Sequence, residues 1–299
     1  MKSITIHGLE TIPEVREGDD IARLIHEASI REEVQLSDGD VVMVTSKIVS
    51  KSEGRIVHLL DVSPSSKARA VARVTGKDAV EVEMILRESQ GIRAVIPVRK
   101  IASRFPEIFS AISNDREVAS RLLTQEPAFL VTVTKGGLMA TDAGLDYSNN
   151  PPGSCTVLPE NPDSSATAIR AELGRISGAD VAVVITDTEV SFTHLYGSMD
   201  IAIGFSGIQP VSRLFGTTDR YGREKFGGAD VVVDELAAAA ALLMGQTSEG
   251  IPVVVVKNLA YDREGAPLKA PQDALTKGIW WSFLATLKLK LSPVLQPFV

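Results

Sequence analysis

Short runs of apolar, mostly β-branched residues predict the strands of a buried sheet. The clearest run covers residues 181–185 and is followed at once by the polar triplet Thr186-Asp187-Thr188. Because an unbroken apolar run is typical of a strand buried on both faces, we expect this strand inside a sheet, ending at the triplet. Similar runs predict strands at about residues 3–7, 41–44, 56–57, 92–98, 129–133, 199–205 and 251–256.

Apolar residues spaced three or four apart predict helices between these strands. Residues 99–126 look helical and polar, with Pro106 as a break, and form either a local insertion or a lid over a site. An apolar stripe within residues 270–299 predicts a helical tail, for which a core or dimer-facing position is favoured over a membrane surface. The other predicted helices cover about residues 20–29, 63–76, 78 onward, 163–175 (with Asp163 as a cap) and 230–244, the last ended by Gly245.

Composition places the chain among globular proteins with one large or two smaller domains. The 299 residues are 44% hydrophobic and 23% charged, and the net charge of −7 argues against a basic nucleic-acid surface. Cys155, alone of its kind, fits a reducing cytosol and is interpreted as a packing residue. No secretory segment opens the chain and no apolar run could span a bilayer, so a cytoplasmic protein is expected.

Four segments carry candidate chemistry, and each has a plainer interpretation. Asp187 after its buried strand could hold a hard cation such as Mg²⁺, or simply cap a turn. The loop after the strand at 41–44, with Ser46, Lys47 and Lys51, could cradle phosphate, or be a solvated hairpin. The polar loop 141–153 is a shaped ligand site or a surface turn. The glycine-bounded loop 245–250 could wrap a nucleotide through backbone N–H groups, or be a connection.

Common nucleotide and metal motifs are missing. The sequence has no G-x-x-x-x-G-K-[ST] phosphate loop, no G-x-G-x-x-G after a strand, no paired CxxC and no H-E-x-x-H. Any nucleotide chemistry therefore needs a less common scaffold.

Five motifs in this order resemble those of the γ-glutamyl ligases that act on the precursor of the deazaflavin coenzyme F-420. The similarity runs from about residue 8 to residue 258. The motifs are Gly39-Asp40-Val41-Val42 with Thr45-Ser46-Lys47, Ser50-Lys51 and Glu53-Gly54-Arg55; Ala143-Gly144-Leu145-Asp146 with Ser148-Asn149; Val184-Ile185-Thr186-Asp187-Thr188; Tyr221-Gly222-Arg223-Glu224; and Asp234-Glu235-Leu236-Ala237 with Leu243-Met244-Gly245 and Gly250-Ile251-Pro252-Val253-Val254-Val255.

The resemblance implies an activity and its co-substrates. The family joins L-glutamate to the precursor through amide bonds, using GTP and two Mg²⁺ or Mn²⁺ ions, with K⁺ as a further ion. The acceptor carboxylate attacks the γ-phosphate to give an acyl phosphate, which the amine of glutamate then attacks. It implies an α+β fold with mixed sheets and flanking helices, two interleaved subdomains in one ligase unit, and an intertwined homodimer.

The resemblance also implies site residues, position by position. Asp146 and Asp187 match ligands of one divalent ion, and Thr188 and Gln246 match positions at a second. Positions that match GTP contacts are Ile12, Pro13, Glu14, Val15, Ser46, Lys47, Lys51, Asn149, Met244, Gly245, Gln246, Thr247, Ser248, Glu249, Gly250 and Ile251.

The chain departs from the family pattern at two places near the predicted site. Glu189-Val190-Ser191-Phe192 stands where the family often has a Gly-Arg pair, and Gln246 stands where relatives have a metal-binding Glu. An arginine would suit an anionic acceptor, so the first departure favours a ligase with a different carboxylate acceptor as an alternative. The second favours a nucleotide-binding relative without catalysis.

Overall fold

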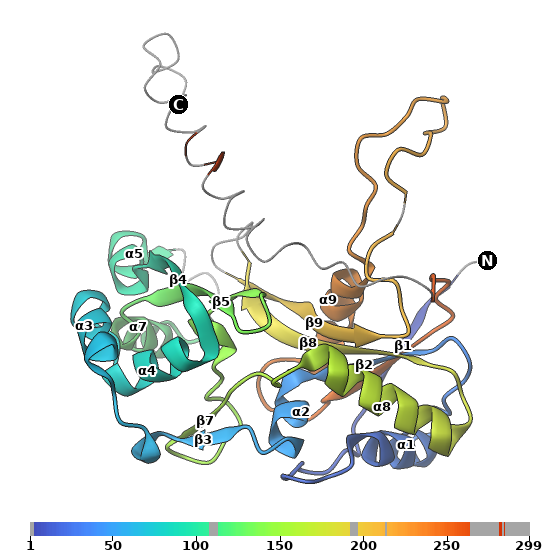
Figure 1. The fold of residues 1–299 in the computed structure, drawn as a ribbon, viewed down its shortest axis with the longest axis horizontal. Coiled ribbons are helices and arrows are strands. Elements are labelled where there is room, and N and C mark those ends of the chain that lie inside the picture. The colour runs from blue at the N-terminus through green and yellow to red at the C-terminus, as the bar shows by residue number, and fades with distance from the viewer. Residues whose placement is uncertain are drawn as a thin grey trace. The chain divides into compact units, whose positions relative to one another are not determined.

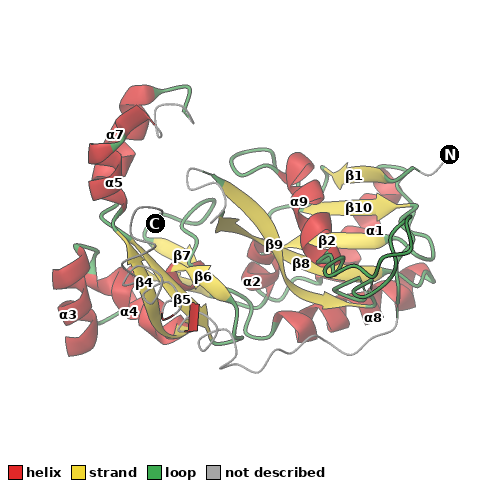
Figure 2. Ribbon diagram, turned by 90° about the horizontal axis from the view of Figure 1, so that it is seen from above, coloured by secondary structure: helices red, strands yellow, loops and turns green. Residues whose placement is uncertain are grey.

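A five-stranded mixed sheet is the centre of the fold. The structure is a computed structural model that describes residues 3–107, 113–191, 197–212, 214–263, 281, 282 and 284. Within these residues β2 and β8 are parallel and the other neighbouring strands of the sheet are antiparallel (Figure 2). The strand order is β1 (Thr5–Leu9), β10 (Val253–Lys257), β2 (Val41–Thr45), β8 (Ala182–Val190) and β9 (Ser198–Ser206).

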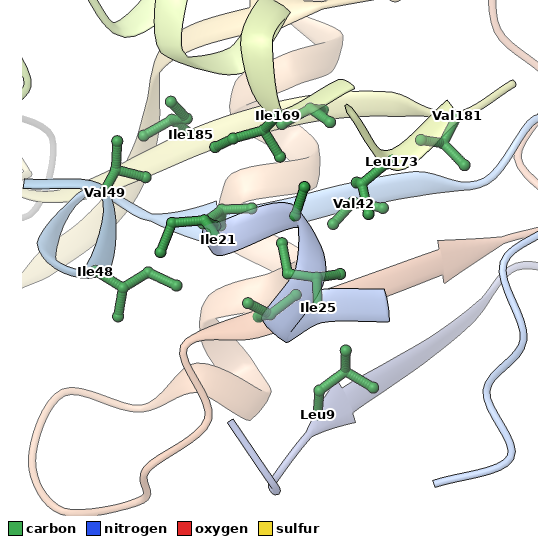
Figure 3. Close-up of a cluster of buried hydrophobic side chains, with 14 of the residues drawn as sticks. Leu9, Ile21, Ile25, Val42, Ile48, Val49, Ile169, Leu173, Val181 and Ile185 are labelled. Atoms are coloured by element: carbon green, nitrogen blue, oxygen red, sulfur yellow. The ribbon is translucent and has the colours of Figure 1, made fainter. Parts of the chain in front are cut away.

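Helices cover both faces of this sheet (Figure 1). Alternate residues of β2 explain why, because successive side chains of a strand point to opposite faces. Val42 and Val44 join one core cluster and Val41 and Met43 join another. The first cluster lies under α1 (Ile21–Arg31), α2 (Ser46–Ser52) and α8 (Pro162–Ser177), as Figure 3 shows, and the second lies under α9 (Val232–Met244).

A smaller sheet follows in the middle of the chain and forms its own core. Leu130 and Ala143 pack there against Ala68, Val82 and Ile85 from two helices. A two-stranded ribbon, β3 with β7, connects this part to the rest of the chain. The elements are β3 (Ile56–His58), η1 (Leu59–Asp61), α3 (Ser66–Thr75), α4 (Ala79–Glu88), β4 (Ser89–Ile96), α5 (Val98–Arg104), α7 (Arg116–Gln125), β5 (Phe129–Thr134), β6 (Met139–Thr141), η2 (Asp142–Gly144) and β7 (Ser154–Thr156).

The observed mixture of sheets and flanking helices confirms the coarse fold prediction. Helices α5 and α7 cover most of the described residues of 99–126, while the status of this stretch as an insertion or lid stays a prediction. One compact unit covers Met1–Gly265 and a second covers Ala266–Val299; the predicted tail 270–299 falls almost wholly outside the described residues. No helix in the described part of the chain is long and apolar enough to cross a membrane.

Three local predictions are wrong, each for a physical reason. The expected loop at Ser46 is helix α2, because Ile48 and Val49 give this segment an apolar side that packs into the core. The strand does not end at Thr186, because its pairing with β9 continues to Val190 after its pairing with β2 stops. Asn161, and not Asp163, caps α8, because the Asp163 carboxylate accepts a hydrogen bond from the Phe205 N–H of β9 instead.

Candidate active site

A cavity of about 660 Å³ opens where the parallel strands β2 and β8 reach their last shared pair, Thr45 with Thr186. Ligands in mixed sheets commonly bind outside the carboxyl ends of parallel strands, and this volume lies in the usual range for small-molecule sites. Every residue assigned above to GTP or metal lines this cavity. They are Ile12, Pro13, Glu14, Val15, Ser46, Lys47, Lys51, Asp146, Asn149, Asp187, Thr188, Met244, Gly245, Gln246, Thr247, Ser248, Glu249, Gly250 and Ile251.

Among the described residues, helix α2 supplies the two cations that line the cavity. Lys47 and Lys51 are four residues apart, so they lie on the same side of the helix. The Lys47 ammonium lies 2.5 Å from the Asp146 carboxylate and donates to the Ser148 hydroxyl and carbonyl at 2.6 Å. Lys51 is buried and donates to Glu14 at 2.5 Å and to the Asn149 carbonyl at 2.9 Å. Both ammonium groups therefore hold the polar loop against α2.

The polar loop and the loop after α9 also meet across the cavity. The Asn149 amide donates to the Thr247 carbonyl at 2.9 Å, and Asn149 itself has a left-handed backbone (φ 50°) that Asn tolerates better than most residues. The Glu249 carboxylate accepts from the Thr247 N–H at 2.8 Å, which keeps the second loop compact. The polar loop and the loop after α9, about a hundred residues apart in the sequence, are thus hydrogen-bonded to each other beside the cavity.

Asp187 lies on β8 among other acidic groups. Its carboxylate accepts from the Ser46 hydroxyl at 2.6 Å. Burial raises the pKa of Asp187 to about 7, against the effect of the Ser46 hydrogen bond, and the charges of Asp146, Glu189 and Asp200 raise it further. The Asp187 carboxylate therefore lacks the positive charge that would stabilise it.

This donor set fits a hard divalent cation. In the described residues no three His, Cys, Asp or Glu side chains converge closely enough to hold a metal alone. Asp146 and Asp187 nevertheless face the same cavity with the Thr188 hydroxyl and the Gln246 amide, and all of their donor atoms are oxygen. Mg²⁺ commonly takes one or two carboxylates and completes its shell with water and substrate phosphate, so a cation here would relieve the mutual repulsion of these acids.

Asp200 is a cavity residue that the sequence did not reveal. It is buried on β9 directly opposite Thr188, and its carboxylate accepts from the Thr188 hydroxyl at 2.7 Å. Burial raises the pKa of Asp200. The signal was present in the sequence only as a polar residue within an otherwise apolar strand. Other cavity residues outside the assignment are Thr45, Ile48, Thr141, Gly144, Leu145, Ser148, Thr186 and Pro252.

Glu189, where the chain departs from the family pattern, makes hydrogen bonds within the protein. Its buried carboxylate accepts from the Thr141 N–H at 2.8 Å and from the Thr141 hydroxyl at 2.5 Å. This contact joins β8 to the end of β6, just before the polar loop. Phe192, in the same departure, lies outside the described residues.

The raised pKa of Asp187 predicts how the stability of the metal-free protein changes with pH. Between pH about 4 and about 7 the folded protein keeps a proton that the unfolded chain has released, so the free energy of unfolding falls as pH rises through this window. Asp187→Asn removes this slope and makes the metal-free protein more stable than wild type above pH about 7. Urea denaturation across this range measures the difference; parallel curves for the two proteins would contradict it.

Comparisons with known proteins agree on one family. The family model described as "F420-0:Gamma-glutamyl ligase" matches residues 10–258. A "Coenzyme F420:L-glutamate ligase" of Methanopyrus kandleri is 37% identical over 259 residues, covering 86% of this chain and 88% of the relative. The protein of the same name from Methanothermobacter thermautotrophicus is 35% identical and covers 90% and 97%. The chain therefore belongs to the F420-0:gamma-glutamyl ligase family.

Proposed function

We propose that this protein is a GTP- and divalent-metal-dependent ligase that adds L-glutamate to the coenzyme F-420 precursor through an amide bond. The observation that carries the proposal is the convergence of six separate segments on one cavity, in a chain of this family. We place the reaction in the cytoplasm, since the buried free Cys155 fits a reducing compartment.

Lys47 and Lys51 are proposed to bind the phosphates of GTP. Both ammonium groups already point into the cavity, where they meet carboxylates and carbonyl oxygens. Phosphate oxygens are stronger partners for an ammonium than carbonyl oxygens, because the hydrogen bond is charge-assisted at both ends. Asn149, the segment Ile12, Pro13, Glu14 and Val15, and the loop from Met244 to Ile251 would enclose the rest of the nucleotide.

Asp146 and Asp187 are proposed to hold one Mg²⁺ or Mn²⁺, and Thr188 and Gln246 a second, with K⁺ as a further ion. Bound ions would neutralise the charge of the phosphates during transfer. The hydrogen bond from Ser46 to Asp187 and the one from Ser198 to the Gln246 carbonyl oxygen, at 3.2 Å, support the proposal, because they restrict the orientation of two of the four side chains.

The reaction follows from the need to activate a carboxylate. An oxygen of the acceptor carboxylate bonds to the γ-phosphorus of GTP, the bond to the β-phosphate oxygen breaks, and GDP leaves. The amine of glutamate then attacks the acyl carbon, loses a proton, and releases phosphate that retains one acceptor oxygen. Such a transfer needs positioning and charge stabilisation from the protein, so no covalent enzyme nucleophile is required.

A ligase with a different acceptor is the second candidate. The observation that favours it is the commitment of Glu189 to Thr141, because an acid held in this way offers no positive charge to an anionic acceptor. A relative that binds nucleotide without catalysis is the third, and Gln246 favours it because an amide is a weaker metal ligand than a carboxylate.

Turnover assays separate these candidates. Purified protein is incubated with GTP, Mn²⁺, glutamate and the F-420 precursor, and GDP is measured. GDP formation that requires both precursor and glutamate supports the proposal. Turnover only with another carboxylate supports the second candidate, and GTP binding without turnover on any acceptor supports the third.

Asp200→Asn is expected to weaken binding of the second ion. The Thr188 hydroxyl donates its proton to Asp200, which leaves its lone pairs free for a metal, and loss of such a supporting partner typically weakens metal binding about 10- to 100-fold. The Mn²⁺ concentration for half-maximal turnover measures the effect. Thr188→Val in the same background should add little, and full additivity would show that Asp200 acts independently of Thr188.

The intertwined homodimer and the two interleaved subdomains are proposed as well. Residues 214–230 project away from α9 as a long arm (Figure 1). The arm is closed by a bridge between Thr218 and Glu224 and by edge-to-face packing of Phe215 on Phe226, yet Phe226 is 96% exposed and Tyr221 is 89% exposed. Exposed aromatic side chains on a projecting arm suit a second copy of the chain. Sedimentation should give twice the chain mass of 32.0 kDa, and a monomer would overturn the proposal.

A further inference from the structure

Lys77 is a buried cation away from the cavity. It lies between α3 and α4, and its side chain is completely shielded from solvent. The ammonium is 2.8 Å from Glu81, 2.8 Å from Glu126 and 3.2 Å from Asp142. It also donates to the Ala128 carbonyl at 2.9 Å. Four acceptors from three segments therefore surround one ammonium.

The charge of Lys77 is held firmly. Burial disfavours the ammonium, but the charges of Asp142, Glu126 and Glu81 outweigh burial and raise the pKa of Lys77. Burial has the opposite consequence for Asp142, whose pKa rises to about 6 despite the contact with Lys77. Without the ammonium, these acids would be close together with no countercharge.

Asp142 opens a backbone turn that needs external support. Asp142, Ala143 and Gly144 have φ angles of 46°, 58° and 71°, all in the left-handed region. This region is unfavourable for residues with a Cβ and persists only where surrounding contacts impose it. The contacts are present: one Asp142 oxygen accepts from the Leu130 N–H at 2.8 Å and the other faces Lys77.

This turn sets the direction in which the polar loop runs to the cavity. Asp146 follows Asp142 by four residues, and its backbone then pairs with Thr156 in an isolated bridge. The Asp146 carboxylate reaches Lys47 in the cavity. Any change in the turn therefore moves Asp146 and Asn149 relative to α2.

We propose that Lys77 is a positioning residue for the polar loop: through Asp142 it fixes the left-handed turn that places Asp146 and Asn149 in the cavity. The assignment of Asp146 and Asn149 as ligand groups rests on the proposed function, whereas the positioning itself does not. Through Glu126, at the end of α7, the same ammonium links α7 to this loop.

Two substitutions around the same ammonium test the proposal. Asp142→Asn removes the charge that the loop presents to Lys77 and keeps a residue that tolerates left-handed backbone. Glu126→Gln is the matched control, because it removes an equal charge from the same ammonium at a helix end and leaves the loop contact intact. Lys77→Met is the direct variant, but it leaves three acids without a countercharge and so endangers folding. The test therefore uses Asp142→Asn and Glu126→Gln.

Two measurements read the outcome. Affinity for Mn²⁺ with a non-hydrolysable GTP analogue is expected to fall about 10-fold in Asp142→Asn and less than about twofold in Glu126→Gln. Hydrogen exchange of the amides at 142–149 should accelerate only in Asp142→Asn. Equal effects of the two variants, or unchanged exchange in Asp142→Asn, would overturn the positioning role. Failure of wild type to bind the analogue would instead overturn the proposed function, while the exchange result would still decide the role of Lys77.

Discussion

Asp187→Asn is expected to reduce metal-dependent turnover at least about a thousandfold, because a metal that stabilises charge in phosphoryl transfer is worth several kcal/mol and each 1.36 kcal/mol is tenfold in rate. The fold should survive, since Asn is of equal size and removes a carboxylate whose pKa is already raised to about 7. Steady-state rates and Mn²⁺ affinity, measured side by side, give the result.

Asp180→Asn is the matched control for this prediction. Asp180 lies just before β8, near the opposite end of the same strand, where it pairs with Arg170 and Arg263 on the surface. Its loss should leave turnover within about twofold of wild type, as exposed ion pairs contribute little. Full activity in Asp187→Asn would remove this residue from the metal site.

Lys47→Met is expected to lower kcat/KM for GTP about 10- to 100-fold, the usual effect of losing one hydrogen bond to a charged group. The substitution also frees Asp146 from its ion pair, so Mn²⁺ affinity in the absence of nucleotide should stay equal or rise. Initial rates against GTP concentration and Mn²⁺ titrations without GTP separate the two effects.

The control for Lys47→Met is Lys67→Met, since Lys67 is exposed on α3 and does not line the cavity. Its kinetic constants should match those of wild type. A loss in both variants would point to a general effect of net charge, and a loss of Mn²⁺ affinity in Lys47→Met would show that Lys47 supports the metal site instead of opposing it.

The sequence predicted the longer strands and the end of α9, because these signals are local, whereas the short strands β6 and β7 and the cap of α8 were missed. The run before Asp187 indicated β8, and Gly245 marked the end of α9 with its positive φ of 62°. Helix α2 was missed because seven residues are too few to show a clear period, and its stability comes from Ile48 and Val49 in the core.

Site residues could be predicted only where they belong to a recognisable motif. Single motifs left open whether Asp187 holds a metal or caps a turn, and whether Lys47 binds phosphate or is a surface lysine. Only the resemblance combined the two residues in one site. Asp200 and Lys77 carry no motif. The role of each depends on a partner far along the chain or across a strand pair, which spacing cannot show.

The proposed reaction transfers the γ-phosphoryl group of GTP to the carboxylate of the acceptor. The most direct test uses F-420 precursor with ¹⁸O in its terminal carboxylate, together with GTP, Mn²⁺ and glutamate, and analyses the released phosphate by mass spectrometry. If an acyl phosphate forms, one labelled oxygen is expected in phosphate for each amide bond made. Amide formation with unlabelled phosphate would contradict the proposed reaction.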